Sequence, residues 1–108
     1  MKPVQYRQGD VLLERISALP ATAYLEHENG PCVLAYGEAS GHAHQVRTQG
    51  RLWIDPAVPE RRYLEVTAPT QLEHEEHGAI ALEPAVYEVM LQREYDPAQP
   101  QRFRRVLD

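Results

Sequence analysis

Short stretches of alternating apolar and polar residues run along most of this chain, separated by prolines, glycines and other turn-forming residues. Residues 62–68 show the pattern: Tyr63 and Glu65 fall on one side, and Leu64 and Val66 on the other. A repeat of two residues is the period of a β-strand, whose successive side chains point to opposite faces. We therefore expect this segment to be a strand.

The rest of the chain is divided in the same way. Nine prolines and six glycines leave few windows that suit a long helix. We expect residues 19–28 to form a loop or a short helical turn, and Asn29-Gly30 to supply the positive φ angles of a tight turn. Besides residues 62–68, the expected strands or extended segments are residues 9–17, 32–38, 42–48, 51–55 and 70–78, two segments within 79–95, and an edge strand or tail at 102–108.

About seven to eight short strands at this spacing are typical of an all-β barrel or sandwich. The strands are expected to be mostly antiparallel, and a cupin-like barrel is one form that fits. Residues 9–17 carry apolar side chains on both faces, which favours a central position in the sheet. With 108 residues, the chain is expected to form a single β-barrel-like domain, residues 1–108.

Composition narrows the classes of partner. The formal net charge of −5 argues against bulk binding to nucleic acid or to an anionic membrane. Two local groups of basic residues are interpreted as solvated or ion-paired, with phosphate contact as the alternative: Arg61 and Arg62, and Arg102, Arg104 and Arg105.

The single cysteine, Cys32, lies in an apolar run and is expected to be a small buried side chain. Trp53 is expected in the core. No apolar stretch has the form of a secretion signal or the length of a membrane span, so a cytoplasmic protein is expected.

Four of the five histidines fall in two short windows of the sequence. His42 and His44 lie in "GHAH", and His74 and His77 lie in "HEEH". In a strand, residues i and i+2 share a face, so His42 and His44 would stand side by side with Cα atoms roughly 6.6 Å apart. Both rings could then reach one metal ion.

The second pair is less regular because His74 and His77 are separated by an odd number of residues. A β-bulge or a helical turn would bring both to one side, and we expect His77 to join through a bulge. The four histidines are therefore predicted to form one metal site. Imidazoles suit Zn, Fe, Ni, Cu or Mn, and histidine alone does not choose among them.

Carboxylates near the histidines are candidates for a general base or for orienting an imidazole. We single out Glu38 and Glu76 for this role. Glu75 is expected to belong to a solvated acidic face, and His27, in a polar turn, to be solvated as well. Two interpretations without a metal centre of this kind stay open: metal-free acid–base or phosphate-binding histidines, and plain structural histidines.

The segment "GEASGHAH" followed by a β-rich chain resembles the first half of a cupin. That resemblance implies a β-barrel in which His42 and His44 correspond to the two ligands of the cupin HxH motif. The cupin glutamate and the histidine of the second cupin motif have no counterpart in this sequence. His74 and His77 would have to replace them from another strand.

Most of the chain also resembles a group of short uncharacterised proteins from bacterial and phage genomes. The shared pattern is "GE…GHAH" at Gly37 to His44, "HEEH" at His74 to His77, and "Y.V…QREY" at Tyr87 to Tyr95. This resemblance implies no particular activity.

These observations predict a small metal-binding protein with a four-histidine site. It could be a metal-dependent enzyme acting on a small molecule. The alternatives are a non-enzymatic accessory module that binds another protein, with structural histidines or zinc, and a metal-free histidine-dependent phosphoesterase. An open sheet edge in so small a domain is commonly covered by a second copy, so a homodimer is also expected.

Overall fold

The computed structural model describes residues 4–36, 42–58 and 61–91. In these ranges the chain forms ten β-strands and no helix. The strands are β1 (Gln5–Gln8), β2 (Val11–Ile16), β3 (Tyr24–His27), β4 (Cys32–Tyr36), β5 (Ala43–Val46), β6 (Gly50–Ile54), β7 (Arg62–Val66), β8 (Thr70–Leu72), β9 (Ile80–Leu82) and β10 (Ala85–Leu91). The all-β prediction is confirmed.

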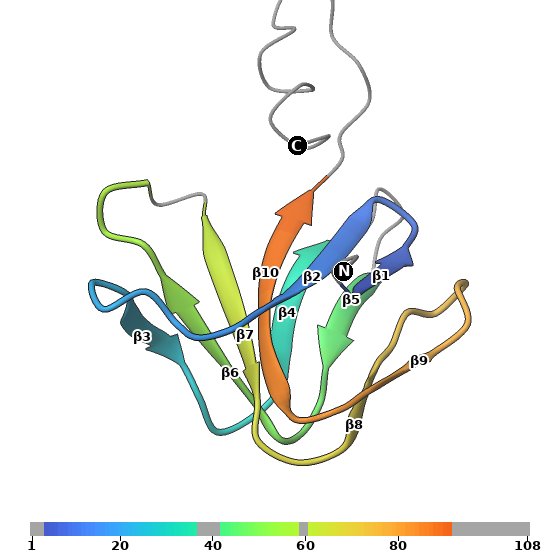
Figure 1. Cartoon of the computed structure of the whole chain (residues 1–108). Coiled ribbons are helices and arrows are strands. Elements are labelled where there is room, and N and C mark those ends of the chain that lie inside the picture. The colour runs from blue at the N-terminus through green and yellow to red at the C-terminus, as the bar shows by residue number, and fades with distance from the viewer. Residues whose placement is uncertain (1–3, 37–41, 59–60, 92–108) are drawn as a thin grey trace, which may run out of the picture.

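The main sheet has six antiparallel strands in the order β1-β2-β10-β7-β6-β3, and two small hairpins, β4-β5 and β8-β9, accompany it (Figure 1). β1 and β3 are the two edges of the main sheet and do not pair with each other, so the sheet does not close into a barrel. The architecture is therefore an open, sandwich-like arrangement rather than a closed cupin-like barrel.

A backbone bridge joins the two small hairpins. Gln45 in β5 and Glu73, directly after β8, exchange two hydrogen bonds, with N···O distances of 2.9 Å and 2.8 Å. The chain after β8 is therefore held beside β5.

The core includes apolar side chains from the main sheet and from both hairpins. Leu13, Leu64 and Tyr87 of the main sheet are fully buried, as are Leu34 of β4 and Leu72 of β8. Burying this apolar surface is the principal driving force for folding.

The sequence pattern located most strands but missed two. β2 is central, as expected, between β1 and β10. Residues 24–27 were expected to lie in a loop or helical turn, yet they form β3; every residue of β3 is exposed, so it carries no alternating signal. β1 is largely polar, and it becomes a strand because it pairs with β2 across a tight hairpin.

Two of the predictions made for single residues are confirmed. Asn29 and Gly30 have φ angles of 63° and 119°, the positive values expected of the turn. Cys32 is fully buried, and burial, followed by the nearby charge of Glu26, raises the pKa of its thiol. The expected edge strand or tail at 102–108 lies outside the described residues.

In the part of the chain that the structure describes, no helix has the length and apolar character needed to span a bilayer.

Candidate functional site

The rings of His42, His44, His74 and His77 lie in one cluster, called here the histidine cluster. The ring centroids of His44 and His74 are 4.3 Å apart, and those of His74 and His77 are 4.7 Å apart. The distances from His42 to His74 and from His44 to His77 are 5.6 Å and 5.7 Å. The two windows of the sequence therefore meet in the folded chain.

The Gln45–Glu73 bridge explains this meeting. It fixes β5, which carries His44, beside the segment that begins with His74. His44 is buried, with 2% of its surface exposed, whereas His42 just before β5 is half-buried. His77 joins the cluster through a bend at residues 75–77 rather than through the β-bulge expected from the sequence, because the strand has already ended.

His74 stabilises that bend with its own ring. Its Nδ1 accepts the backbone N–H groups of Glu76 and His77, at 3.0 Å and 3.3 Å. An Nδ1 that accepts hydrogen bonds carries no proton, so in this conformation the proton of a neutral His74 ring sits on Nε2.

Gln8 of β1 fixes the orientation of His44. Its Nε2 donates to the carbonyl oxygens of Leu72 and Gly78, at 3.0 Å and 2.9 Å. Its Oε1 therefore faces His44 Nδ1, at 2.9 Å, and Nδ1–H must be the donor. Among the described residues, Gln8 and His44 are the two buried polar side chains, and they bond to each other. This arrangement assigns the proton of a neutral His44 to Nδ1 and leaves the lone pair on Nε2.

The turn between β1 and β2 closes over the cluster. Gly9 has a φ angle of +58°, and a Cβ atom placed on it would lie 2.8 Å from His77 Nε2 and 3.1 Å from His44 Cε1. The next residue, Asp10, places its Oδ1 3.4 Å from His44 Nε2. The sequence pattern did not point to Gln8 or Asp10, although "QGD" between two strands is a recognisable hairpin turn.

Glu75 ties the two histidine segments together. Its Oε1 accepts the backbone N–H of Ala43 at 2.8 Å, between His42 and His44. That hydrogen bond is the main reason that the pKa of Glu75 is lowered. The expectation that Glu75 only forms part of a solvated acidic face was therefore incomplete.

Of the two carboxylates singled out from the sequence, Glu76 lies at the edge of the cluster. Its Oε1 is 3.6 Å from His42 Nδ1, and its side chain is 69% exposed. Glu38 lies outside the described residues.

Burial has the largest effect on the pKa of His44. It lowers the pKa of the ring, as does the neighbouring His74, while the carboxylate of Asp10 acts in the opposite direction. The neutral ring, with a free Nε2 lone pair, is the form that can bind a metal ion.

In the conformation shown, no three His, Cys, Asp or Glu side chains among the described residues form a group that could hold a metal ion. The rings are neighbours, but their nitrogens do not converge on one point. Binding a metal ion would require some of these side chains to rotate.

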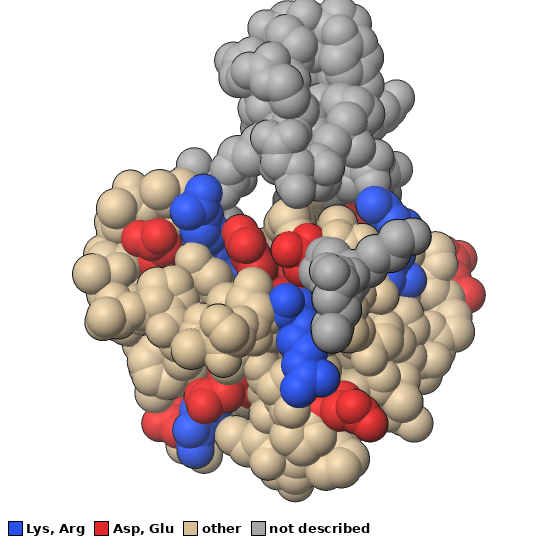
Figure 2. All heavy atoms as spheres, viewed as in Figure 1, with Lys and Arg blue, Asp and Glu red and all other residues tan. Residues whose placement is uncertain are grey.

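The remaining candidates lie apart from the cluster. His27 is exposed in β3, an edge strand on the opposite side of the main sheet from β1 (Figure 1). Arg61 pairs with Glu88 at 3.7 Å, and Arg62 donates to the carbonyl oxygen of Leu34. On the face shown in Figure 2, basic and acidic side chains lie close to one another over a mostly uncharged surface.

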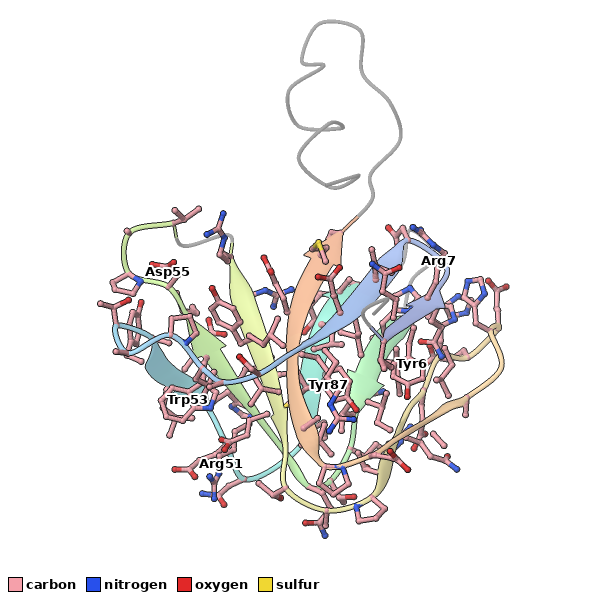
Figure 3. All side chains as sticks on the ribbon, viewed as in Figure 1. Tyr6, Arg7, Arg51, Trp53, Asp55 and Tyr87 are labelled. Atoms are coloured by element: carbon pink, nitrogen blue, oxygen red, sulfur yellow. The ribbon has the colours of Figure 1, made fainter. Side chains whose placement is uncertain are left out.

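Two of the aromatic residues are packed and hydrogen-bonded. Tyr87 is fully buried, its ring lies 6.0 Å from that of Tyr6, and its hydroxyl donates to Glu83 O at 2.8 Å (Figure 3). Trp53, expected in the core, is half-buried, and its Nε1–H donates to Glu65 at 3.1 Å.

No curated protein and no solved structure matched this chain. A family model matched residues 7–92, a range that contains all four histidines of the cluster and the Gln8-Gly9-Asp10 turn. Because that match covers well over half of the sequence, the chain belongs to the family described as Domain of unknown function (DUF8820).

Proposed function

We propose that this protein binds a divalent transition metal ion, such as Zn, Fe, Ni or Mn, at the histidine cluster. The observation that carries the proposal is that His42, His44, His74 and His77, from two distant segments, have adjacent rings. Histidine is the commonest protein ligand of such ions. The fifth histidine, His27, is exposed in β3, and no ring contact joins it to the cluster in the described part of the chain.

The hydrogen bonds of Gln8 support the proposal. Histidines that bind metals usually donate their other ring N–H to a fixed acceptor, which orients the ring. Gln8 provides that acceptor for His44, and two backbone carbonyl groups hold Gln8 in turn. His44 is therefore the ligand that is best prepared for metal binding.

The other three rings differ in how easily they could turn toward a common ion. His42 is half-buried and His77 is exposed, so both have room to rotate. His74 would first have to release the two N–H groups that its Nδ1 accepts. We therefore expect His44, His42 and His77 to contribute most of the affinity.

A direct test is calorimetric titration of the metal-free protein with Zn(II) and with Ni(II). Wild-type protein should bind one ion per chain, and His44→Ala should weaken binding by at least about tenfold, the loss seen when a metal ligand's surroundings are disturbed. His27→Ala is the matched control, since it removes an exposed histidine far from the cluster, and should bind as the wild type does.

Equal binding by wild type and His44→Ala, or no binding by wild type, would contradict the proposal. Elemental analysis of the protein as purified would identify the ion. If a metal is bound, an ion with an exchangeable water would favour an enzyme acting on a small molecule. Unfolding on chelation, without any activity, would favour a structural metal in an accessory module.

A further inference from the structure

The turn Gln8-Gly9-Asp10 contacts both nitrogens of one buried imidazole. Gln8 Oε1 lies 2.9 Å from His44 Nδ1, and Asp10 Oδ1 lies 3.4 Å from His44 Nε2. Gly9 lets the backbone pass against the His77 and His44 rings, where a Cβ atom would be too close. Three consecutive residues thus lie against the ring that is best oriented for binding.

The hydrogen bonds leave two acceptors facing each other on the Nε2 side. Nδ1 carries the proton, because it faces an amide oxygen. In the neutral ring, Nε2 is then a bare acceptor, and it faces a carboxylate oxygen, which is also an acceptor. Two acceptors at this distance repel each other unless a proton or a metal ion lies between them.

The spacing of these two atoms suits a shared metal ion. Two ligand atoms bound tetrahedrally at 2.0–2.1 Å from one ion are about 3.3 Å apart. The observed separation of Nε2 and Oδ1 is 3.4 Å. The side chain of Asp10 is 42% exposed, so the space beside it is open to solvent while His44 is buried.

His77 lies on the same side of the turn. Its Nε2 is 2.8 Å from the position of a Gly9 Cβ, and its ring is nearly parallel to that of His44, at an angle of 22°. His77 is exposed, so its side chain has room to rotate, and rotation toward His44 and Asp10 would supply a third ligand atom.

We propose that Asp10 is a metal ligand together with His44 and His77, so that the site combines imidazoles with one carboxylate. This inference rests on the proposed metal binding and specifies its chemistry. A carboxylate oxygen extends the accepted ions toward Mn(II) and Fe(II), which pure histidine sites favour less. With His42 bound as well, three imidazoles and one carboxylate fill four positions of an octahedral ion and leave two open for water or for a small-molecule ligand.

The test compares Mn(II) and Zn(II) binding to wild type, Asp10→Asn and Asp55→Asn, with Co(II) absorption as a report on the ligands. Asp10→Asn should lower Mn(II) affinity by at least about tenfold, lower Zn(II) affinity less, and alter the visible spectrum of the Co(II) form. Asp55→Asn is the matched control. Asp55 accepts the Ala57 N–H in a turn that lies on the other side of the molecule from Arg7, the residue before Gln8 in β1 (Figure 3). The Asp55→Asn variant should therefore bind metal ions as the wild type does.

The outcomes separate the two proposals. If wild type binds Zn(II) and His44→Ala does not, but Asp10→Asn matches wild type in affinity and spectrum, then Asp10 is not a ligand and metal binding stands. If wild type binds none of the three ions, both proposals fail. Asp10→Ser provides a second variant should Asp10→Asn not fold, and circular dichroism checks the fold of each.

Discussion

Gly9 matters both for the backbone conformation of the β1–β2 turn and for the space available to the histidine rings. Its φ angle of +58° lies in the left-handed region, and its missing Cβ leaves room for the rings of His77 and His44. A β-carbon would meet both a backbone penalty and a steric one. At Gly78, by contrast, an added β-carbon would have no neighbouring atom within 4 Å, and the φ angle is not positive.

Gly9→Ala should therefore destabilise the protein by about 1–2 kcal/mol through the left-handed backbone alone, with a further cost from the contact with the buried ring of His44. It should also weaken metal binding, because the rings must move. Gly78→Ala should change stability by less than about 0.5 kcal/mol. Urea denaturation of both variants measures the difference, and equal midpoints for the two would contradict this role of Gly9.

At the scale of elements, the cluster depends on how β5 is held beside the segment after β8. Two backbone hydrogen bonds between Gln45 and Glu73 make the first connection. Glu75 adds a side-chain connection one step away, to the N–H of Ala43. The first connection does not depend on pH, and the second depends on the charge of a carboxylate.

Titration of Glu75 should be visible at the amide of Ala43. The hydrogen bond lowers the pKa of Glu75 in the folded state, so its stabilising effect is complete above the ordinary value of about 4.3. The effect is lost only as the pH falls through the lower, folded-state pKa. The Ala43 amide shift in NMR spectra should therefore titrate with a midpoint below about 4.3.

Glu75→Ala provides the control for this prediction. The variant should abolish the titration and speed hydrogen exchange at Ala43, while the amides of Gln45 and Glu73 stay protected by the backbone bridge. An Ala43 midpoint at or above the ordinary glutamate value in the wild type would show that the bond does not form in solution.

At the scale of the whole molecule, stability comes from one apolar core shared by the main sheet and the two hairpins. Leu64 of β7 is fully buried in that core. Leu25 of the edge strand β3 is 37% exposed, so a leucine-to-alanine substitution there can be compared with the same substitution at Leu64.

Leu64→Ala should cost about 2–5 kcal/mol, because it removes buried methyl groups and leaves a cavity. Leu25→Ala should cost much less, within about 0.5 kcal/mol. Chemical denaturation followed by the fluorescence of Trp53 would measure both. Similar losses in the free energy of unfolding for the two variants would mean that the core does not lie where the structure places it.

The local pattern of the sequence was sufficient for the all-β class and for strands such as β2, β7 and β10, because alternation along a strand is a local property. It also drew attention to the four histidines, whose rings do meet. It missed β3, which is exposed on both faces, and it expected a bulge at His77 where the chain makes a bend that His74 caps.

Only the tertiary structure brought Gln8 and Asp10 to His44. Gln8 is 36 positions from His44 in the sequence, and its bonds to Leu72 and Gly78 span still longer separations. Nothing in the residues around a glutamine specifies which distant ring its amide will face. That is decided by the pairing of strands and the closing of a shared core, which set the β1–β2 turn against the histidine cluster.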